Sequence, residues 1–442
     1  MINSAKYQVM RLSRFERIFI RIARNYVGLY KDHAFRFYFD DARYPLIGDG
    51  PEVVEVRFHH AEALFKAVFA EGSVGLGESY CKGWIEVDDR LYKHFLAMLI
   101  RTVYQPRLLL RLPAADIFYI LRAKFNRQFF TKKDKSENIN SHYSLSEWFA
   151  DAADANAFYL FWLDAHYIQY TCGKWDEDTR TLEEAQENKL AFYADRMGID
   201  QNARGKTMID LGCGWGGSLF YMAEKFGIKT KGITLSTAQA AYIRKEAARR
   251  GLEDLVSVEV DDVHNAAGAY DYVISIGLLE HITDYHHLYR RVAGLLKKGG
   301  TALFHAIFHT ERFYKVDPFL SKYIFPGGST PGIRSNLRIF RKYFKVVDRN
   351  NLPDNSYPKT LACWYDRFCR NEGAIRKLLA EKSSVKDIDF AVRMFKHYLV
   401  LAQCGLSDNL GLVANIMLKT EVAAEPDTAP AQPIRIPARS GA

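Results

Sequence analysis

The sequence has few cysteines, no long apolar run and no metal-ligand cluster, and each absence excludes a class of protein. Its 442 residues include 6 Cys, so scattered that no CxxC pair or Cys/His cluster has the spacing of a zinc site. We therefore expect thiols in a reducing compartment. No uninterrupted apolar stretch reaches the roughly 18 residues of a membrane-spanning helix, and charges interrupt the first residues where a signal peptide would be apolar. We expect a soluble or peripheral protein in the cytoplasm.

What is abundant is apolar and basic residues. Hydrophobic residues make up 48% of the chain and aromatic residues 14%, which is enough for well-buried cores. The length favours two domains with tails. The 61 Lys and Arg exceed the 52 Asp and Glu and give a formal net charge of +9. This balance favours an anionic partner, either nucleic acid or the surface of an acidic membrane.

Residues 11–26 have the pattern of a basic amphipathic helix. Such a helix either lies at a membrane surface, where Arg holds anionic lipid, or packs against its own domain. Its apolar face comprises Leu12, Phe15, Ile18, Phe19 and Ile22, surrounded by Arg11, Arg14, Arg17, Arg21 and Arg24.

The rest of the N-terminal region predicts a small α+β domain. Short strand-like runs over residues 35–58 precede a helix over 60–71 and a Gly-rich stretch. A helical, basic segment then leads to a polar linker, and the last residues are rich in Pro and Ala. We predict a lipid-docking domain over 1–130, a linker over 131–141, a second domain over 142–422 and a disordered tail over 423–442. The basic residues of the dock are Arg101, Arg107, Arg111, Arg122, Lys124 and Arg127.

The most specific local motif lies in the second domain. An apolar strand ending at Asp210 runs into a turn with Gly212, Gly214 and Gly216, where glycines let the backbone turn tightly and approach a ligand. From Thr207 onward strands and helices alternate, which predicts a parallel sheet wrapped by helices. A nicotinamide-binding fold would place an acid after the second strand, but Thr234, Leu235 and Ser236 stand there.

Polar residues follow the later strands as well. The third strand, 256–260, precedes Asp261 and Asp262, and the fourth, 270–276, leads to Glu280. The fifth strand begins at Thr301 and carries His305. The strand that ends in an acid and G-x-G resembles the first motif of class I S-adenosylmethionine-dependent methyltransferases. We therefore predict an α/β fold with a Rossmann-like doubly wound sheet and a smaller α+β N-terminal domain.

A longer series of motifs resembles one family, the cyclopropane-fatty-acyl-phospholipid synthases and the related lipid and mycolic-acid methyltransferases. The resemblance runs from about residue 142 to 420 and more faintly through residues 72–84. Its motifs are His142-Tyr143, Tyr170-Thr171-Cys172 with Trp175, residues 182–190, residues 212–217, Thr234-Leu235-Ser236 with Gln239, Glu280-His281, His305, residues 323–328, and Tyr357 before Thr360-Leu361.

The resemblance implies a reaction. In this family a cis double bond of a phospholipid acyl chain attacks the methyl group of S-adenosylmethionine, and a bound bicarbonate removes a proton from the resulting carbocation. The product is a cyclopropane, or a methyl-branched or methylene chain. The residues that the resemblance implies for catalysis are Cys172, Glu280, His305, Tyr357 and Cys404. Those implied for cofactor binding are Tyr170, Thr171, Asp210, Gly212, Gly214, Gly216, Thr234, Leu235, Ser236, Gln239, Asp262 and Val263.

Elementary chemistry agrees with such a site. An alkene is a weak nucleophile and water would capture a carbocation, so the pocket must be dry with one base held near the reacting carbon. Glu280 beside an anion requires a shared proton, which a buried carboxyl with a raised pKa can provide. Singly, a His or Tyr at a strand end is more often structural, and Cys172 is also consistent with a plain buried thiol.

Two departures from the family pattern bear on these roles. Val263 and the two residues after it replace a Tyr-Arg-Asp run, so the adenine contacts are altered. The family places a reactive Cys after a Tyr-Leu pair, and ungapped alignment on Tyr398 puts Ala402 there and Cys404 two residues later. Both changes are consistent with a branch that makes a methylated rather than a cyclopropanated chain.

Three alternatives stay open beside the main prediction of a membrane phospholipid substrate with unsaturated acyl chains on an anionic membrane surface. One is a methyltransferase for a small molecule or another lipid, and another is a lipid-binding paralogue without catalysis. A nucleic-acid methyltransferase suits the charge, but the sequence lacks the Asn/Asp-Pro-Pro-aromatic type of motif expected for it; we expect no nucleic-acid partner and no metal. The oligomeric state is undecided, with a homodimer among the alternatives.

Overall fold

The computed structural model describes residues 12–28, 31–40, 42–104, 111–130, 148–309, 316–353, 355–407 and 412–419. The chain forms two compact units. Unit 1 comprises Met1–Ala150, Val316–Gly327 and Tyr357–Leu410, and unit 2 comprises Asp151–Lys315, Gly328–Ser356 and Gly411–Ala442. The predicted linker 131–141 and tail 423–442, and the motif residues His142 and Tyr143, lie outside the described residues.

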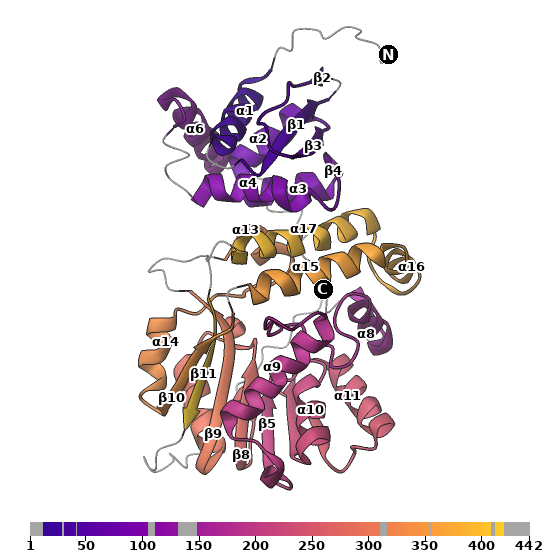
Figure 1. The fold of residues 1–442 in the computed structure, drawn as a ribbon, viewed down its shortest axis with the longest axis vertical. Helices are drawn as coiled ribbons and strands as arrows, with labels where there is room; N and C mark the ends of the chain where they lie inside the picture. The colour runs from indigo at the N-terminus through magenta and orange to yellow at the C-terminus, as the bar shows by residue number, and fades with distance from the viewer. Residues whose placement is uncertain are drawn as a thin grey trace. The chain divides into compact units, whose positions relative to one another are not determined.

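Unit 1 contains a small α+β region, as predicted (Figure 1). Its four-stranded sheet has the order β2-β1-β3-β4, with β1 and β3 parallel and the other pairs antiparallel. The strands are β1 (His33–Phe39), β2 (Ala42–Arg43), β3 (Glu52–Phe58) and β4 (Ile85–Val87). The helices are α1 (Arg14–Val27), α2 (Ala61–Glu71), α3 (Ser73–Cys81), α4 (Tyr92–Tyr104) and α6 (Ala114–Phe130).

Helix α1 is docked on its own domain. Ser13 and Glu16 form a capping box at its start. Ile18 and Phe19 are buried, and the Phe19 ring packs edge-on against Phe37 of β1 at 4.9 Å between centroids. The membrane interpretation of the apolar face of this helix is therefore wrong, because the sheet of unit 1 already covers that face.

The later helices of unit 1 pack on its N-terminal helices, although they are far away in sequence. Helix α17 (Ile388–Ser407) lies against α3 and α4. Arg393 of α17 donates to the carbonyl of Tyr80 at 2.7 Å, and Lys396 pairs with Asp89 at 2.6 Å. The other helices are α13 (Pro318–Tyr323), α15 (Ser356–Arg370) and α16 (Glu372–Lys382). Unit 1 is thus discontinuous in sequence, unlike the division at residues 130 and 142 that we predicted.

Unit 2 contains a seven-stranded sheet with the order β10-β11-β9-β8-β5-β6-β7. Strands β5 to β9 are all parallel to one another, which confirms the predicted parallel sheet, and β11 is antiparallel to both of its neighbours. The strands are β5 (Thr207–Leu211), β6 (Lys229–Thr234), β7 (Val256–Val260), β8 (Tyr270–Ile276), β9 (Leu296–Phe308), β10 (Lys345–Asn351) and β11 (Leu412–Lys419).

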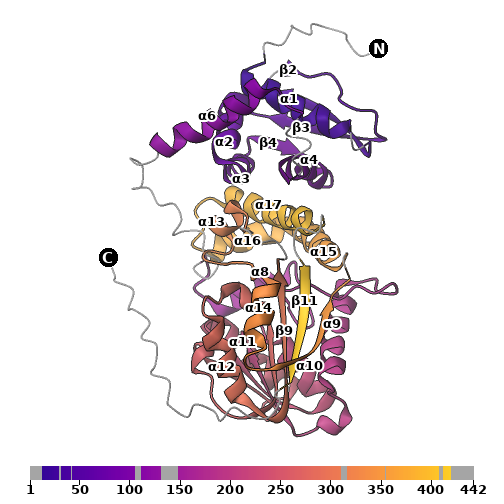
Figure 2. The same cartoon turned by 90° about the vertical axis from the view of Figure 1, so that its left-hand side faces the viewer.

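Helices cover both faces of this sheet (Figures 1 and 2). One core, with Leu190, Leu219 and Ile243, lies under the first set of helices, and a second core, with Leu288 and Phe340, lies under the other set. The first set is α9 (Leu182–Met197), α10 (Gly217–Phe226) and α11 (Thr237–Arg250), and the second is α12 (Tyr285–Leu295) and α14 (Ile333–Phe340). Helix α8 (Ala152–Leu160) packs on α11. The doubly wound arrangement is as predicted.

Two local features differ from the sequence pattern. Strand β9 begins at Leu296, five residues before the predicted Thr301. The Gly-rich stretch after residue 72, for which the sequence indicated no element, forms helix α3. The glycines there serve close packing: a Cβ on Gly77 would stand 2.2 Å from the ring of Phe319. Within the described residues no helix has the length and apolar character needed to span a membrane. All six cysteines are described, and none forms a disulfide.

Candidate active site

The glycine turn follows β5 directly. Gly212, Gly214 and Gly216 all have positive φ, at 83°, 54° and 83°. The amides of Gly212 and Cys213 both donate to the carbonyl of Ile233 on β6, at 3.0 Å, which fixes the turn between the two strands. A Cβ on Gly214 would meet no atom within 4 Å, so the turn borders open space. This geometry allows a ligand to approach the backbone closely.

Asp210 lies beneath this turn. It is 2% exposed, and the Ser218 hydroxyl donates to its Oδ2. Its Oδ1 is buried and has no partner among the described residues. Burial raises the pKa of Asp210 to about 7, and the Ser218 hydrogen bond acts in the opposite direction. A buried acceptor of this kind can be satisfied by the ammonium group of an amino-acid ligand, so the residues present fit the predicted cofactor.

The end of β6 is organised by three polar side chains. Thr234 is buried, and its hydroxyl donates to Gln239 at 2.6 Å. The Ser236 hydroxyl accepts from the Gln239 amide at 3.2 Å and caps α11. Leu235 is 70% exposed, so it offers an apolar surface beside this end.

Asp262 and Val263, the two predicted cofactor residues after β7, lie in different environments. Asp262 is half-buried and caps a short helical turn by accepting from the His264 amide at 2.8 Å. Val263 is buried in the core that lies under α12 and α14. Its side chain is therefore a packing residue, and only its backbone is left for the predicted contact with adenine.

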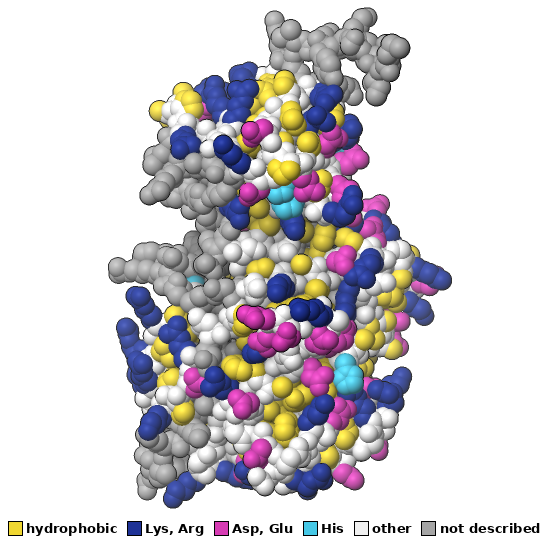
Figure 3. Space-filling view, in the orientation of Figure 1, with side chains coloured by type: hydrophobic (Ala, Val, Ile, Leu, Met, Phe, Trp, Pro, Cys, Tyr) yellow, Lys and Arg dark blue, Asp and Glu magenta, His cyan; other side chains and the backbone are white. Residues whose placement is uncertain are grey.

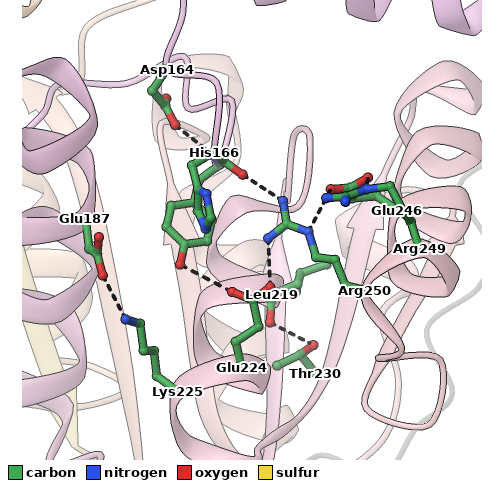
Figure 4. Close-up of polar contacts among 11 residues, drawn as sticks. Asp164, His166, Glu187, Leu219, Glu224, Lys225, Thr230, Glu246, Arg249 and Arg250 are labelled. Carbon is green, nitrogen blue, oxygen red and sulfur yellow. Dashed lines mark hydrogen bonds and ion pairs between the residues drawn. The ribbon is translucent and has the colours of Figure 1, made fainter.

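A segment before α9 lies over the glycine turn. A Cβ on Gly217 would stand 2.6 Å from the carbonyl of Tyr167. Figure 4 shows how Arg250, at the end of α11, holds this segment: it pairs with Glu224 and Glu246 and donates to the carbonyl of His166 at 2.8 Å. The segment is thereby fixed against α10 and α11.

Tyr170 and Thr171 continue this segment into the site. The Tyr170 ring packs edge-on against Trp162 at 5.3 Å. Thr171 is held by two residues of α9: Gln186 donates to its carbonyl at 2.8 Å, and Lys189 donates to its hydroxyl at 2.6 Å. A Cβ on Gly277, just after β8, would stand 3.0 Å from the Thr171 methyl group, so the segment reaches the carboxyl end of β8.

Cys172 is fully buried, and its thiol donates to the carbonyl of Gly173 at 3.2 Å. Its electrostatic neighbours on α9 are Lys189 and Tyr193. Lys189 is also fully buried, and burial lowers its pKa to about 7, although Cys172 and Asp164 act in the opposite direction. A buried thiol beside a buried amine is a suitable place for a small anion.

His305 lies in β9 opposite the last residue of the neighbouring strand β8, and Glu280 follows β8. His305 of β9 is 2% exposed, and its Nδ1 lies 2.7 Å from the hydroxyl of Tyr193 on α9. The amide of Ile307, two residues further along β9, donates to Glu280 Oε1 at 2.7 Å. Oε2 of Glu280 is buried without a partner among the described residues. Burial raises the pKa of Glu280 to about 7, and the Ile307 hydrogen bond partly opposes that shift.

Tyr357 and Cys404 belong to unit 1, whereas the other predicted catalytic residues belong to unit 2. Tyr357 is half-buried near the start of α15, and the preceding Ser356 accepts from the Trp175 amide at 3.2 Å. Cys404 is buried on α17 and donates to the carbonyl of Lys93 at 3.5 Å. Their catalytic roles stay predictions.

The inner face of α9 was missed by sequence reasoning. Gln186, Lys189 and Tyr193 are spaced by three and four residues, so they share one face of the helix. The spacing of these polar residues among apolar ones was the available signal, but the burial of all three depends on the sheet beneath them.

One group within the described residues brings three side chains of metal-ligand types together. Ligand atoms of His33, Glu52 and His94 in unit 1 lie within 4.8 Å of one another. His33 Nε2 lies 3.3 Å from the Glu52 carboxylate, and the two imidazole rings lie 3.8 Å apart between centroids at a tilt of 31°. These contacts account for the group, and we assign it no metal.

Comparisons with known proteins agree with this geometry. Residues 130–412 match the family model described as mycolic acid cyclopropane synthetase. The chain is 30% identical over 359 residues to the cyclopropane-fatty-acyl-phospholipid synthase of Escherichia coli, covering 79% of this chain and 84% of the relative. It is 26% identical to the tuberculostearic acid methyltransferase UfaA1 of Mycobacterium tuberculosis over 80% of this chain and 81% of that protein. A structure of the mycolic acid cyclopropane synthase CmaA1, complexed with SAH and CTAB, aligns with a TM-score of 0.54 at 24% identity, covering 64% of this chain and 97% of that one.

Proposed function

The chain belongs to the mycolic acid cyclopropane synthetase family, whose members are S-adenosylmethionine-dependent lipid methyltransferases and cyclopropane synthases, and we propose that it modifies a cis double bond in an unsaturated acyl chain of a membrane phospholipid. S-adenosylmethionine supplies an electrophilic methyl group. One alkene carbon would bond to the methyl carbon as the methyl–sulfur bond breaks, S-adenosylhomocysteine would leave with that electron pair, and the resulting chain cation would lose a proton to the base. Loss of the proton from the added methyl group closes a cyclopropane. Loss from a neighbouring chain carbon leaves a methyl-branched alkene, and a hydride shift before loss from the methyl group leaves a methylene product.

The residues of unit 2 divide this work between them. Asp210 and the glycine turn bind the cofactor, and Thr171, Thr234, Ser236 and Gln239 shape the same side of the sheet. Bicarbonate, the base that we propose, would be held by Cys172, Glu280 and His305, and the role that the resemblance implies for Tyr357 stays a prediction. The observation that carries the proposal is Glu280: its buried Oε2 has no partner in the part of the chain that the structure describes, and its pKa of about 7 lets it share a proton with an anion.

The test is an assay with labelled cofactor. Purified protein is incubated with S-adenosylmethionine carrying a labelled methyl group and with vesicles of unsaturated anionic phospholipid, and the released fatty acids are analysed by mass spectrometry. The expected result is a gain of one labelled CH2 on the acyl chain, and ozonolysis then separates a ring from an alkene. Cofactor binding without labelled lipid would instead support a small-molecule methyltransferase or a lipid-binding paralogue without catalysis.

For membrane contact we propose helix α6 in place of α1. Phe118 and Leu121 lie one turn apart and are 67% and 58% exposed, and the adjacent Arg122 is exposed too. Basic and acidic side chains are mixed on the face of the molecule shown in Figure 3. Charge alone therefore does not mark a membrane-binding surface. Helix α6 adds exposed apolar side chains near the basic Arg14, which donates to the Ala115 carbonyl at 2.9 Å.

The α6 contact is tested by vesicle co-sedimentation. The double substitution Phe118→Glu with Leu121→Glu is expected to weaken binding to anionic vesicles more than about tenfold, since two apolar side chains and their favourable transfer are lost. Leu46→Glu is the matched control, because Leu46 is 45% exposed in the same unit. Equal loss in the control, or no loss in the double variant, contradicts the α6 contact.

A further inference from the structure

The site contains a buried tyrosine that the proposed reaction does not use. Tyr193 of α9 is fully buried and lies 2.7 Å, measured from its hydroxyl oxygen, from Nδ1 of His305. A tyrosine hydroxyl in such a place needs an acceptor for its proton. The nearby thiol of Cys172 is an electrostatic neighbour, and burial holds the pKa of Tyr193 well above its ordinary value, so the hydroxyl keeps its proton.

The hydrogen bond has two formal directions. If Nδ1–H of His305 donated to the tyrosine oxygen, the tyrosine proton would need another acceptor, and within the described residues no other hydrogen-bond partner of this hydroxyl occurs. If the tyrosine donates instead, one hydrogen bond gives its proton an acceptor and gives Nδ1 of His305 a donor. A buried hydroxyl proton without an acceptor destabilises the folded protein, which decides in favour of donation by Tyr193.

We propose that Tyr193 is a positioning residue that holds neutral His305 in the tautomer with its proton on Nε2. Neutral imidazole carries one proton, so an Nδ1 that accepts from Tyr193 leaves Nε2 as the donor. A donor at Nε2 is what an anion beside His305 requires. This inference rests on the proposed function for its catalytic consequence, but the tautomer itself does not depend on it.

The first test reads the tautomer directly. Protein labelled with 15N-histidine is studied by NMR, and the His305 signals are assigned by their loss in His305→Gln. The expected wild-type spectrum has a protonated Nε2 and an unprotonated Nδ1. In Tyr193→Phe the Nε2–H form is expected to lose its dominance. An Nδ1-protonated or doubly protonated His305 in the wild type overturns the proposal, as does an unchanged tautomer in Tyr193→Phe.

The second test separates positioning from packing. Tyr193→Phe keeps the ring and is expected to lower kcat about tenfold, the scale of one buried hydrogen bond, with unchanged affinity for S-adenosylmethionine. Tyr289→Phe is the matched control, because Tyr289 is also fully buried in unit 2 and its hydroxyl donates to Asn336 at 2.6 Å. A kcat loss in Tyr193→Phe no larger than in the control overturns the role in turnover. If the wild type shows no methyl transfer, the proposed function fails and the NMR result alone decides the tautomer.

Discussion

Two acids of unit 2, Asp210 and Glu280, each have a buried carboxyl oxygen and are alike in their electrostatics, but they differ in how they are held. Asp210 lies in β5 and Glu280 follows the neighbouring strand β8, and burial raises the pKa of each to about 7. Each has one bonded oxygen and one buried oxygen without a partner among the described residues. Asp210 is bonded by the side chain of Ser218, whereas Glu280 is bonded by the backbone amide of Ile307.

This difference determines which of the two acids can lose its hydrogen-bond partner through a side-chain substitution. A substitution of Ser218 alters the acid at the cofactor end without touching the backbone. Only proline in place of Ile307 would remove the amide that holds Glu280, and proline would also disrupt β9. We infer that side-chain substitutions can adjust the environment of Asp210, beside the proposed cofactor site. The backbone of β9 instead fixes the position of Glu280, beside the proposed base.

The largest expected effect on turnover comes from substitution of Glu280. Glu280→Gln should lower kcat by about a thousandfold, the scale of losing a proton-transfer group, while the affinity for S-adenosylmethionine stays unchanged. Asp210→Asn is the mirror variant, expected to weaken cofactor binding about tenfold with a smaller loss of kcat at saturation. Calorimetry of cofactor binding and the labelled lipid assay measure both. Equal losses of binding and turnover in Glu280→Gln would remove the distinction between the two acids.

A smaller effect is expected in the pH dependence of stability. The folded state favours the protonated form of both acids, since their pKa values are raised from 3.8 and 4.5 to about 7. Their contribution is therefore complete below the ordinary pKa and is lost as the pH rises through about 7. Urea unfolding at pH 5 and pH 8 should show that wild type loses about 2 kcal/mol more than Asp210→Asn over this interval. The same decline in both proteins would contradict the raised pKa.

The smallest expected effect concerns the hydrogen bond between Ser218 and Asp210. Ser218→Ala removes the hydroxyl donor to Asp210 and should weaken cofactor binding about fivefold, the scale of one hydrogen bond. Ser275→Ala is the matched control, since the buried Ser275 hydroxyl donates to the carbonyl of Leu211 at 3.1 Å and not to the acid. Equal effects of the two substitutions on cofactor affinity would mean that Ser218 acts through packing alone.

The sequence was sufficient for the parallel sheet and the glycine turn, because these depend on local patterns. Strand β8 lies at the predicted residues 270–276, and the turn after Asp210 has the positive φ that its glycines suggest. It was insufficient for α1 and for α9. The apolar face of α1 has the same pattern whether it meets lipid or β1, and the polar face of α9 reads as solvated until the sheet buries Lys189.

The position of β11 bears on how the chain is completed during synthesis. This strand is the last described element, yet it lies between β9 and β10 and pairs with both. A ribosome releases β9 and β10 before it, so both strands have an unpaired edge until residues 412–419 emerge. A nascent chain halted within α17 would expose two strand edges awaiting the same partner, and a chaperone that shields strand edges would have its longest task there.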